Sequence, residues 1–130
     1  MSILSIAIQK GGSGKTTTAI NLAAALQREG KKILLIDMDP QANLTQSLGI
    51  NGEPGQNLFT ELKKEMEGQN GNLEEITIKI NEGLHLIPSS IELAGAELEL
   101  VSVYGREQLL SWLLKQVEPI YDFIFIDCPP

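Results

Sequence analysis

A glycine-rich run near the start of the chain combines the residue types that bind phosphate groups. Residues 9–17 read QKGGSGKTT. Glycine can adopt backbone conformations that let successive N–H groups point toward phosphate oxygens, and a following helix adds its positive end. The residues predicted to bind a nucleotide are Gly11, Gly12, Ser13, Gly14, Lys15, Thr16 and Thr17.

Lys15 and Thr16 carry the distinct chemistry of this loop. We expect the Lys15 ammonium to contact the β- and γ-phosphates of ATP, and the Thr16 hydroxyl to ligate the Mg²⁺ that bridges them. Thr17 has the lesser role of supporting the first helical turn. The general pattern G-x-x-x-x-G-K-[ST] is not met in full, because Gln9 stands where it has glycine. The loop also has an additional lysine, Lys10, which cradling a nucleotide does not require.

Aspartates follow two apolar runs elsewhere in the chain. Asp37 and Asp39 come at the end of the run over residues 33–36, and Asp127 ends the run over residues 123–126. Side chains two residues apart point to the same side of a strand, so Asp37 and Asp39 should share one side. Ligands of open parallel sheets bind beyond the carboxyl ends of the strands, where these carboxylates would lie. Any one of them could instead simply cap or end its strand.

Alternating strand and helix patterns surround these residues. An apolar run over residues 3–8 precedes the glycine loop, and the residues after it have helical periodicity. Further strands are expected over residues 32–37, 76–80, 84–88 and 121–127, and helices over 44–48, 58–67, 91–100 and 107–117. We expect His85 on the solvent side of its strand and Trp112 in the core.

The segment from Lys10 to Thr16 resembles the deviant Walker A loop of the ParA/MinD group of P-loop ATPases. The block D-M-D-P-Q over residues 37–41 is similar to the second nucleotide motif of the ParA/Soj branch, and residues 83–97 are similar to its middle region. The chain thus resembles a ParA/Soj-type partition ATPase over nearly all of its length. The resemblance is weakest over residues 50–81.

This resemblance implies an α/β fold, a three-layer P-loop NTPase sandwich with a mostly parallel sheet, truncated after the Walker B strand that ends at Asp127. The strand before the P-loop and the Walker B strand should be neighbours. Residues 1–130 would form the amino-terminal part of a single ATPase domain, because family members continue well past that strand. Its ligands would be ATP and Mg²⁺, and the full-length protein would hydrolyse ATP to ADP and phosphate.

The resemblance also implies residue roles and partners. Lys10 would reach the nucleotide of a second subunit and Asp39 would act on the attacking water, while Thr16, Asp37 and Asp127 would serve the metal. The full-length protein would form a homodimer on ATP binding and segregate plasmids or chromosomes. It would bind non-specific DNA and a ParB-like stimulating protein in a nucleoid-associated, cytoplasmic location.

Two other functions stay open from the sequence. A MinD-like membrane-associated ATPase would carry a basic amphipathic helix at its natural carboxyl end. A non-hydrolysing nucleotide-binding regulatory module would use the same motifs only to hold the fold and recruit a partner. The Asp-Pro-Gln block favours the partition branch.

Composition narrows the function classes further. The formal net charge is −7 and the Lys and Arg residues are scattered, so DNA binding through these residues alone is not expected. The single cysteine, Cys128, excludes an intramolecular disulfide and a cysteine cluster for zinc, which fits an intracellular protein. Met1 leads directly into the first expected strand without a signal peptide, and no apolar run reaches the length of a membrane span.

Overall fold

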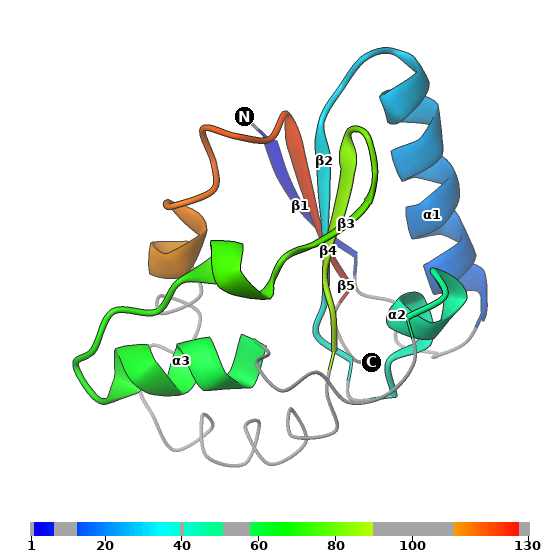
Figure 1. Cartoon of the computed structure of the whole chain (residues 1–130). Coiled ribbons are helices and arrows are strands. Elements are labelled where there is room, and N and C mark those ends of the chain that lie inside the picture. Colours follow the sequence, from blue (N-terminus) through cyan, green and yellow to red (C-terminus); the bar gives the residue numbers. More distant parts are fainter. Residues whose placement is uncertain (1, 7–12, 40, 51–57, 90–110, 128–130) are drawn as a thin grey trace.

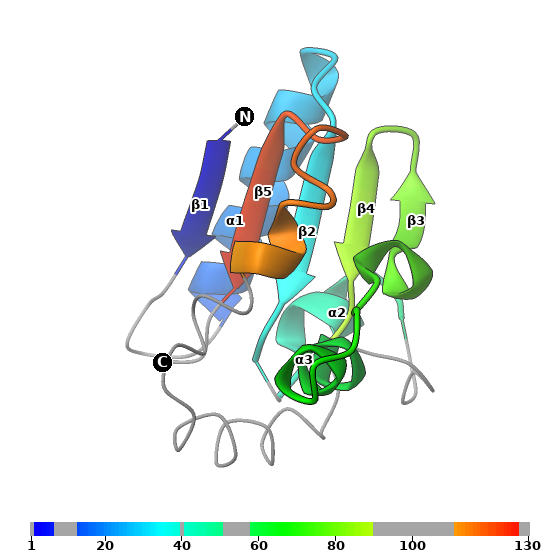
Figure 2. The same ribbon diagram turned by 90° about the vertical axis from the view of Figure 1, so that its left-hand side faces the viewer.

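The structure is a computed structural model that describes residues 2–6, 13–39, 41–50, 58–89 and 111–127. Its strands form one sheet in the order β1-β5-β2-β4-β3. The strands are β1 (Ser2–Ile6), β2 (Ile33–Asp37), β3 (Ile78–Asn81), β4 (Leu84–Ile87) and β5 (Phe123–Asp127). β1, β5, β2 and β4 run parallel, and only β3 is antiparallel to its neighbour (Figure 2). The expected mostly parallel sheet is confirmed, with β1 and β5 as neighbours.

Helices cover both faces of this sheet. α1 (Ser13–Arg28) and α2 (Asn43–Ser47) lie on one face. α3 (Leu58–Met66), the 3₁₀ helix η1 (Leu73–Ile76) and the helical residues 111–114 lie on the other (Figure 1). The arrangement is the three-layer sandwich expected from the sequence.

The core is divided between the two faces by the alternation of side chains along the strands. On β2, Ile33 and Leu35 belong to the cluster under α1 and α2, whereas Leu34 and Ile36 belong to the cluster under α3 and residues 113–117. All four side chains are fully buried. Burying each contributes about 1.5–3 kcal/mol relative to exposure. A parallel sheet covered on both faces therefore needs the unbroken apolar run that β2 has.

Two local expectations need correction. The strand expected from residue 76 begins at Ile78, because Asn72 caps η1 by accepting a hydrogen bond from the Glu74 N–H at 3.0 Å. Trp112 was expected in the core but is 59% exposed, with the Lys115 ammonium 5.3 Å from the centre of its ring. Leu113 next to it faces the core instead. The helix expected over residues 91–100 lies outside the described residues.

Candidate nucleotide-binding site

The first turn of α1 lies at the carboxyl edge of the sheet, near the ends of β2 and β5 (Figure 1). This turn contains Ser13, Gly14, Lys15 and Thr16. The backbone N–H groups of a first helical turn have no partners within the helix and can bind an anion. α1 packs closely on the sheet because small residues, Ala19 and Ala23, face it and are buried.

Part of the predicted loop lies outside the described residues. Lys10, Gly11 and Gly12 are outside the described residues, and for residues 13–16 the backbone alone is described. Thr17 is in α1 with an exposed side chain. The predicted roles of these residues therefore stay predictions.

The structure brings Asp37 and Asp127 together at the same edge. They are register partners in the neighbouring parallel strands β2 and β5, and the Met38 N–H donates to the Asp127 carbonyl at 2.9 Å just beyond the paired strands. Both side chains are buried, at 0% and 1% exposure. Each continues the alternation of Leu35 or Phe125, whose side chains lie on the α1 face. Two carboxylates thus stand side by side on the face that carries the predicted P-loop helix.

Asp37 accepts three hydrogen bonds from the protein. Its Oδ2 accepts from the Thr45 N–H at 2.9 Å and from the Thr45 hydroxyl at 2.6 Å, and its Oδ1 accepts from the Asp39 N–H at 3.1 Å. Thr45 lies in the first turn of α2, whose N-cap residue, Ala42, has no side chain that could cap it. Asp37 therefore caps α2 from the end of a neighbouring strand.

The environment of Asp37 shifts the pKa of its carboxyl. Burial raises the pKa of this carboxyl, the hydrogen bonds from Thr45 and Asp39 oppose that effect, and the nearby charge of Asp127 adds to it. The net result is a pKa above the ordinary value. A cation close to the two carboxylates would offset both the burial and the repulsion.

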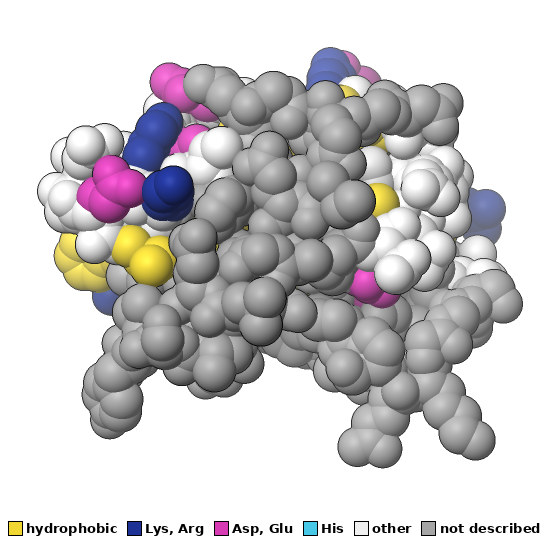
Figure 3. Space-filling model, turned by 90° about the horizontal axis from the view of Figure 1, so that it is seen from below, with side chains coloured by type: hydrophobic (Ala, Val, Ile, Leu, Met, Phe, Trp, Pro, Cys, Tyr) yellow, Lys and Arg dark blue, Asp and Glu magenta, His cyan; other side chains and the backbone are white. Residues whose placement is uncertain are grey.

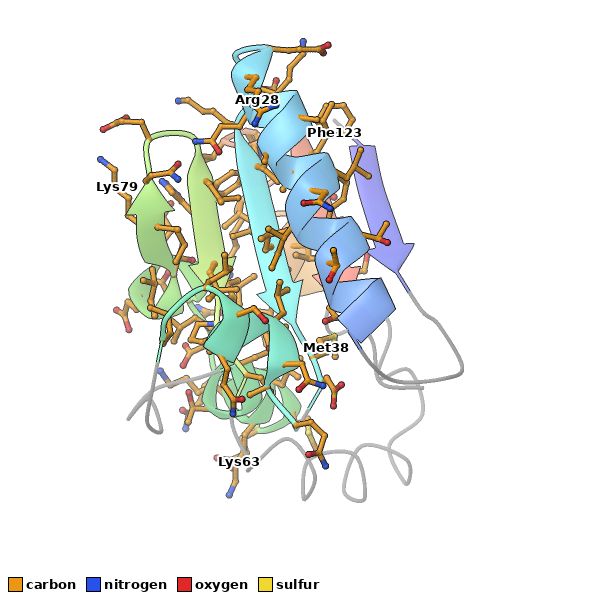
Figure 4. The ribbon with its side chains drawn as sticks, turned by 90° about the vertical axis from the view of Figure 1, so that its right-hand side faces the viewer. Arg28, Met38, Lys63, Lys79 and Phe123 are labelled. Atoms are coloured by element: carbon orange, nitrogen blue, oxygen red, sulfur yellow. The ribbon has the colours of Figure 1, made fainter. Side chains whose placement is uncertain are left out.

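Asp39 lies in the turn between β2 and α2. Its Oδ1 accepts from the Gln41 N–H at 3.0 Å, and its carbonyl accepts from the Ala42 N–H at 2.8 Å and from the Ser89 hydroxyl. Its side chain is buried, two residues beyond Asp37. Figure 4 labels Met38, the residue between the two aspartates, at the carboxyl end of β2 and near α2, far from Phe123 at the start of β5.

Sequence reasoning missed two polar residues of this edge, Thr45 and Ser89. Each is only 3% exposed, and the Ser89 N–H donates to the Thr45 hydroxyl oxygen at 2.9 Å. For Thr45 the sequence contained a signal, because a buried aspartate at a strand end requires hydrogen-bond donors. Thr45 is such a donor and lies near the start of the expected short helix. Nothing in the sequence indicated that Ser89, 44 residues further on, would contact Thr45.

The donor set fits Mg²⁺ bound together with a nucleotide. Mg²⁺ in such sites uses one or two carboxylates, substrate phosphates and waters rather than an all-protein cage. Among the described residues no group of three or more His, Cys, Asp or Glu side chains could hold a metal ion. Asp37 already accepts three protein hydrogen bonds, so it suits contact with the ion through water.

In the view onto the carboxyl ends of the strands, the described Lys and Arg side chains that are visible lie toward the left, top and right of the molecule (Figure 3). The helices that the structure describes include none that is both long and apolar enough to cross a membrane.

A pocket of about 230 Å³ lies at the opposite end of the sheet, away from the aspartates. His85 and Tyr121 line it, with His85 Nδ1 and the Tyr121 hydroxyl 2.7 Å apart. His85 is half-buried against Tyr121 rather than simply turned to solvent, and burial lowers its pKa. This pair is therefore separate from the candidate site.

A helix that follows a glycine-rich segment, beside two parallel strands that end in buried aspartates, defines a P-loop NTPase domain. The comparison with family models agrees. Residues 1–130 match the model of the AAA domain family, and the chain belongs to that family.

Curated relatives support the resemblance to ParA/Soj proteins. The chain is 43% identical over 128 residues to the sporulation initiation inhibitor protein Soj of Bacillus subtilis, covering 98% of this chain and 49% of Soj. It is 45% identical over 122 residues to the chromosome-partitioning ATPase Soj of Treponema pallidum, covering 94% and 46%. The chain thus spans about half the length of the curated relatives it matches.

Solved structures share the fold. Cobyrinic acid a,c-diamide synthase from Mycobacterium smegmatis, with bound ADP and magnesium, superposes with a TM-score of 0.88 at 37% identity, covering 99% of this chain and 51% of that one. A McdA variant from Cyanothece in complex with ATP gives a TM-score of 0.85 at 37% identity, covering 100% and 48%. Both similarities extend over all the described strands.

Proposed function

We propose that residues 1–130 form the amino-terminal part of a ParA/Soj-type ATPase domain that binds and hydrolyses ATP to drive plasmid or chromosome partitioning. The observation that carries this proposal is the buried, in-register pair of Asp37 and Asp127 beside the first turn of α1. Capping α2 requires only Asp37, and a second buried carboxylate beside it raises the cost of ionising both.

ATP and Mg²⁺ are the proposed ligands of this edge. The backbone from Gly11 into the first turn of α1, which contains Gly14, would cradle the phosphates, and Lys15 in the same turn would neutralise their charge. Thr16 ligates the metal, and Asp37 and Asp127 hold its water ligands. When bound, Mg²⁺ neutralises charge on the β- and γ-phosphates. Soj relatives and the nucleotide-bound neighbours support these ligands.

The chain's own residues provide the proposed hydrolysis. Asp39 follows β2 at the same edge and accepts a proton from, or orients, the water that attacks the γ-phosphate. Lys10 extends across a two-fold axis to the γ-phosphate of a second copy, so the active form is a homodimer that assembles on ATP. Conversion of ATP to ADP and phosphate then separates the copies, which makes hydrolysis the timer of a dimerisation switch.

The proposed partners rest on the resemblance of the chain to ParA/Soj proteins. A ParB-like protein stimulates hydrolysis, and non-specific DNA binds to parts of the full-length protein other than these residues, in a cytoplasmic, nucleoid-associated location. The acidic balance of this chain, −7, opposes DNA binding by counterion release here. A MinD-like ATPase is the nearest alternative, but both curated relatives described above are Soj proteins.

The test is an ATP titration and an ATPase assay on the full-length protein, with and without DNA. We expect ATP binding that Lys15→Ala removes while leaving thermal unfolding of the nucleotide-free protein unchanged, and slow hydrolysis that requires Mg²⁺. Lys31→Ala removes an exposed lysine just before β2, at the opposite end of the sheet, and is the matched control that should bind ATP normally. Unchanged ATP affinity in Lys15→Ala would contradict the P-loop assignment. If the wild-type protein binds ATP but does not hydrolyse it, the non-hydrolysing regulatory module becomes the favoured function.

A further inference from the structure

A buried chain of hydrogen bonds connects the end of β4 to Asp37, the last residue of β2, and to Asp39 just beyond it. The Ser89 N–H donates to the Thr45 hydroxyl oxygen at 2.9 Å, and the Thr45 hydroxyl donates to Asp37 Oδ2 at 2.6 Å. The Ser89 hydroxyl in turn donates to the carbonyl of Asp39. All four side chains are 5% exposed or less, so water does not compete for these bonds.

The donors in this chain fix the direction of the Thr45 hydroxyl. A backbone N–H can only donate, so the Thr45 oxygen must accept from Ser89 and its single proton must go to Asp37. With the Thr45 N–H also donating to Oδ2 and the Asp39 N–H donating to Oδ1, the Asp37 carboxylate is held at both oxygens. Its plane is therefore set by partners from the turn after β2 and from α2.

Ser89 contacts both halves of the acidic segment. Its N–H orients the Thr45 hydroxyl that holds Asp37, and its hydroxyl holds the backbone of Asp39. Asp39 is further restrained through its Oδ1, which accepts from the Gln41 N–H at 3.0 Å. A displacement of Ser89 would thus disturb the two aspartates together.

Capping of α2 alone does not account for this arrangement. The Thr45 N–H already donates to Asp37, and any residue except proline at position 45 would provide that bond. The hydroxyl adds a second bond to the same oxygen and a link to β4. What it contributes beyond the cap is the orientation of a carboxylate at the candidate nucleotide site.

We propose that Thr45 and Ser89 are positioning residues that hold Asp37 and Asp39 for ATP hydrolysis without taking part in ATP binding. This inference rests on the proposed ATPase function. Small misplacement of groups that support a reaction costs on the order of 10–100-fold in rate, whereas binding of the nucleotide depends on the P-loop. Hydrolysis should therefore respond to the Thr45 hydroxyl while ATP affinity does not.

The experiment compares Thr45→Val and Thr45→Ser in the full-length protein. Valine keeps the shape and the backbone N–H but removes the hydroxyl, and serine restores the hydroxyl. We expect Thr45→Val to lower kcat by about 10–100-fold with an ATP dissociation constant within about 3-fold of wild type, and Thr45→Ser to recover most of kcat. In the nucleotide-free protein, hydrogen exchange at the Ser89 amide should be faster in Thr45→Val and near normal in Thr45→Ser, because only valine removes its acceptor.

Thr60→Val is the matched control. The Thr60 hydroxyl also donates to a buried carboxylate, Glu61 Oε2 at 2.8 Å, but on the opposite face of the sheet. The Thr60→Val variant should leave kcat, ATP affinity and hydrogen exchange at the Ser89 amide unchanged. An effect of Thr60→Val on kcat as large as that of Thr45→Val would overturn the proposal, because general destabilisation would then explain both.

Other outcomes separate this proposal from the proposed function. Wild-type kcat in Thr45→Val, or a loss of ATP affinity equal to the loss of kcat, would overturn the positioning role. A wild-type protein that neither binds nor hydrolyses ATP would overturn the proposed function instead. If Thr45→Val does not fold, Ser89→Ala decides, since it keeps the Ser89 N–H and removes only the bond to Asp39: reduced kcat at unchanged ATP affinity supports the proposal, and unchanged kcat overturns it.

Discussion

Asp37 and Asp127 are register partners in adjacent parallel strands, and their carboxylates lie buried on the same face of the sheet. Neighbouring strands are about 4.8 Å apart, so the two charges repel at short range in a poorly solvated environment. The charge of Asp127 contributes to the raised pKa of Asp37. The repulsion between the two carboxylates lowers the stability of the nucleotide-free protein, which is typical of a site that binds a cation.

Removing one of these charges should therefore raise the stability of the nucleotide-free protein and weaken its binding of ATP with Mg²⁺. Asp127→Asn is expected to raise the free energy of unfolding of the nucleotide-free full-length protein by about 1 kcal/mol, because it removes the repulsion. The same variant should bind ATP less tightly in the presence of Mg²⁺. Thermal unfolding and nucleotide titration measure the two effects. Asp122→Asn is the control, because Asp122 is exposed and lies at the other end of the strand. It should show neither the gain in stability nor the loss of ATP affinity.

Asp39→Ala tests the proposed role on the attacking water. The variant should bind ATP with wild-type affinity, since Asp39 is not part of the P-loop, but kcat should fall by about 10²–10⁴-fold, the usual contribution of a general base. Single-turnover hydrolysis and a separate binding titration distinguish these quantities. Normal turnover would assign the water to Asp37 or to a residue outside this chain.

Lys10 is best tested by mixing variants. Lys10→Ala alone should spare ATP binding by one copy but remove ATP-dependent dimerisation and hydrolysis, because analogous cations supplied in trans contribute about 10³–10⁵-fold in rate. In a mixture with Asp39→Ala, the copy that keeps Asp39 receives an intact Lys10 from its partner. Partial ATPase activity should return. A mixture that forms mixed dimers and stays inactive would show that Lys10 does not act in trans.

Glu61 provides a pH dependence of stability on the face of the sheet away from the nucleotide site. Burial raises the pKa of its carboxyl, but hydrogen bonds from the Asn72 N–H, the Thr60 hydroxyl and the Lys64 ammonium outweigh it, so the pKa lies below the ordinary 4.5. A carboxyl with a lowered folded pKa stabilises the protein above its unfolded pKa, and that stabilisation is lost as the pH falls through the folded pKa.

We therefore expect the melting temperature of wild type to fall more steeply than that of Glu61→Gln as the pH is lowered from about 5 through the folded pKa, with the two curves closer at acid pH. Glu65→Gln is the control, because Glu65 is a partly exposed neighbour on α3. Parallel pH profiles of wild type and Glu61→Gln would contradict the assignment.

Ala42 limits the choice of residues at the start of α2. Its backbone is left-handed, with φ 58° and ψ 33°, which costs an L-residue about 1–2 kcal/mol. Ala42→Val should lower the free energy of unfolding by a further ~1–2 kcal/mol, because a β-branched side chain fits this region poorly. Ala42→Gly should change it by less than about 1 kcal/mol, since relief of strain is offset by a more flexible unfolded chain. Denaturant unfolding measures both, and equal effects of valine and glycine would contradict this account.

The sequence by itself determined the elements and their order. Apolar runs bounded by aspartate or glycine predicted β2, β4 and β5, and helical periodicity predicted α1 and α3, because such patterns depend only on which side chains must leave water. Period-two alternation predicted that Asp37 and Asp39 share one side. Trp112 was misplaced because a leucine-rich helix does not reveal which of its adjacent residues faces the sheet.

Only the tertiary structure decided which polar groups meet. The pairing of β2 with β5 sets Asp37 beside Asp127, 90 positions apart in the sequence. The contact of Ser89 with Thr45 depends on how the end of β4 approaches α2. Such hydrogen bonds depend on strand order and register, which bring distant segments together. Because local sequence does not specify strand order or register, these contacts could not be predicted from it. The aspartates were visible in the sequence, and the residues that hold them in place were not.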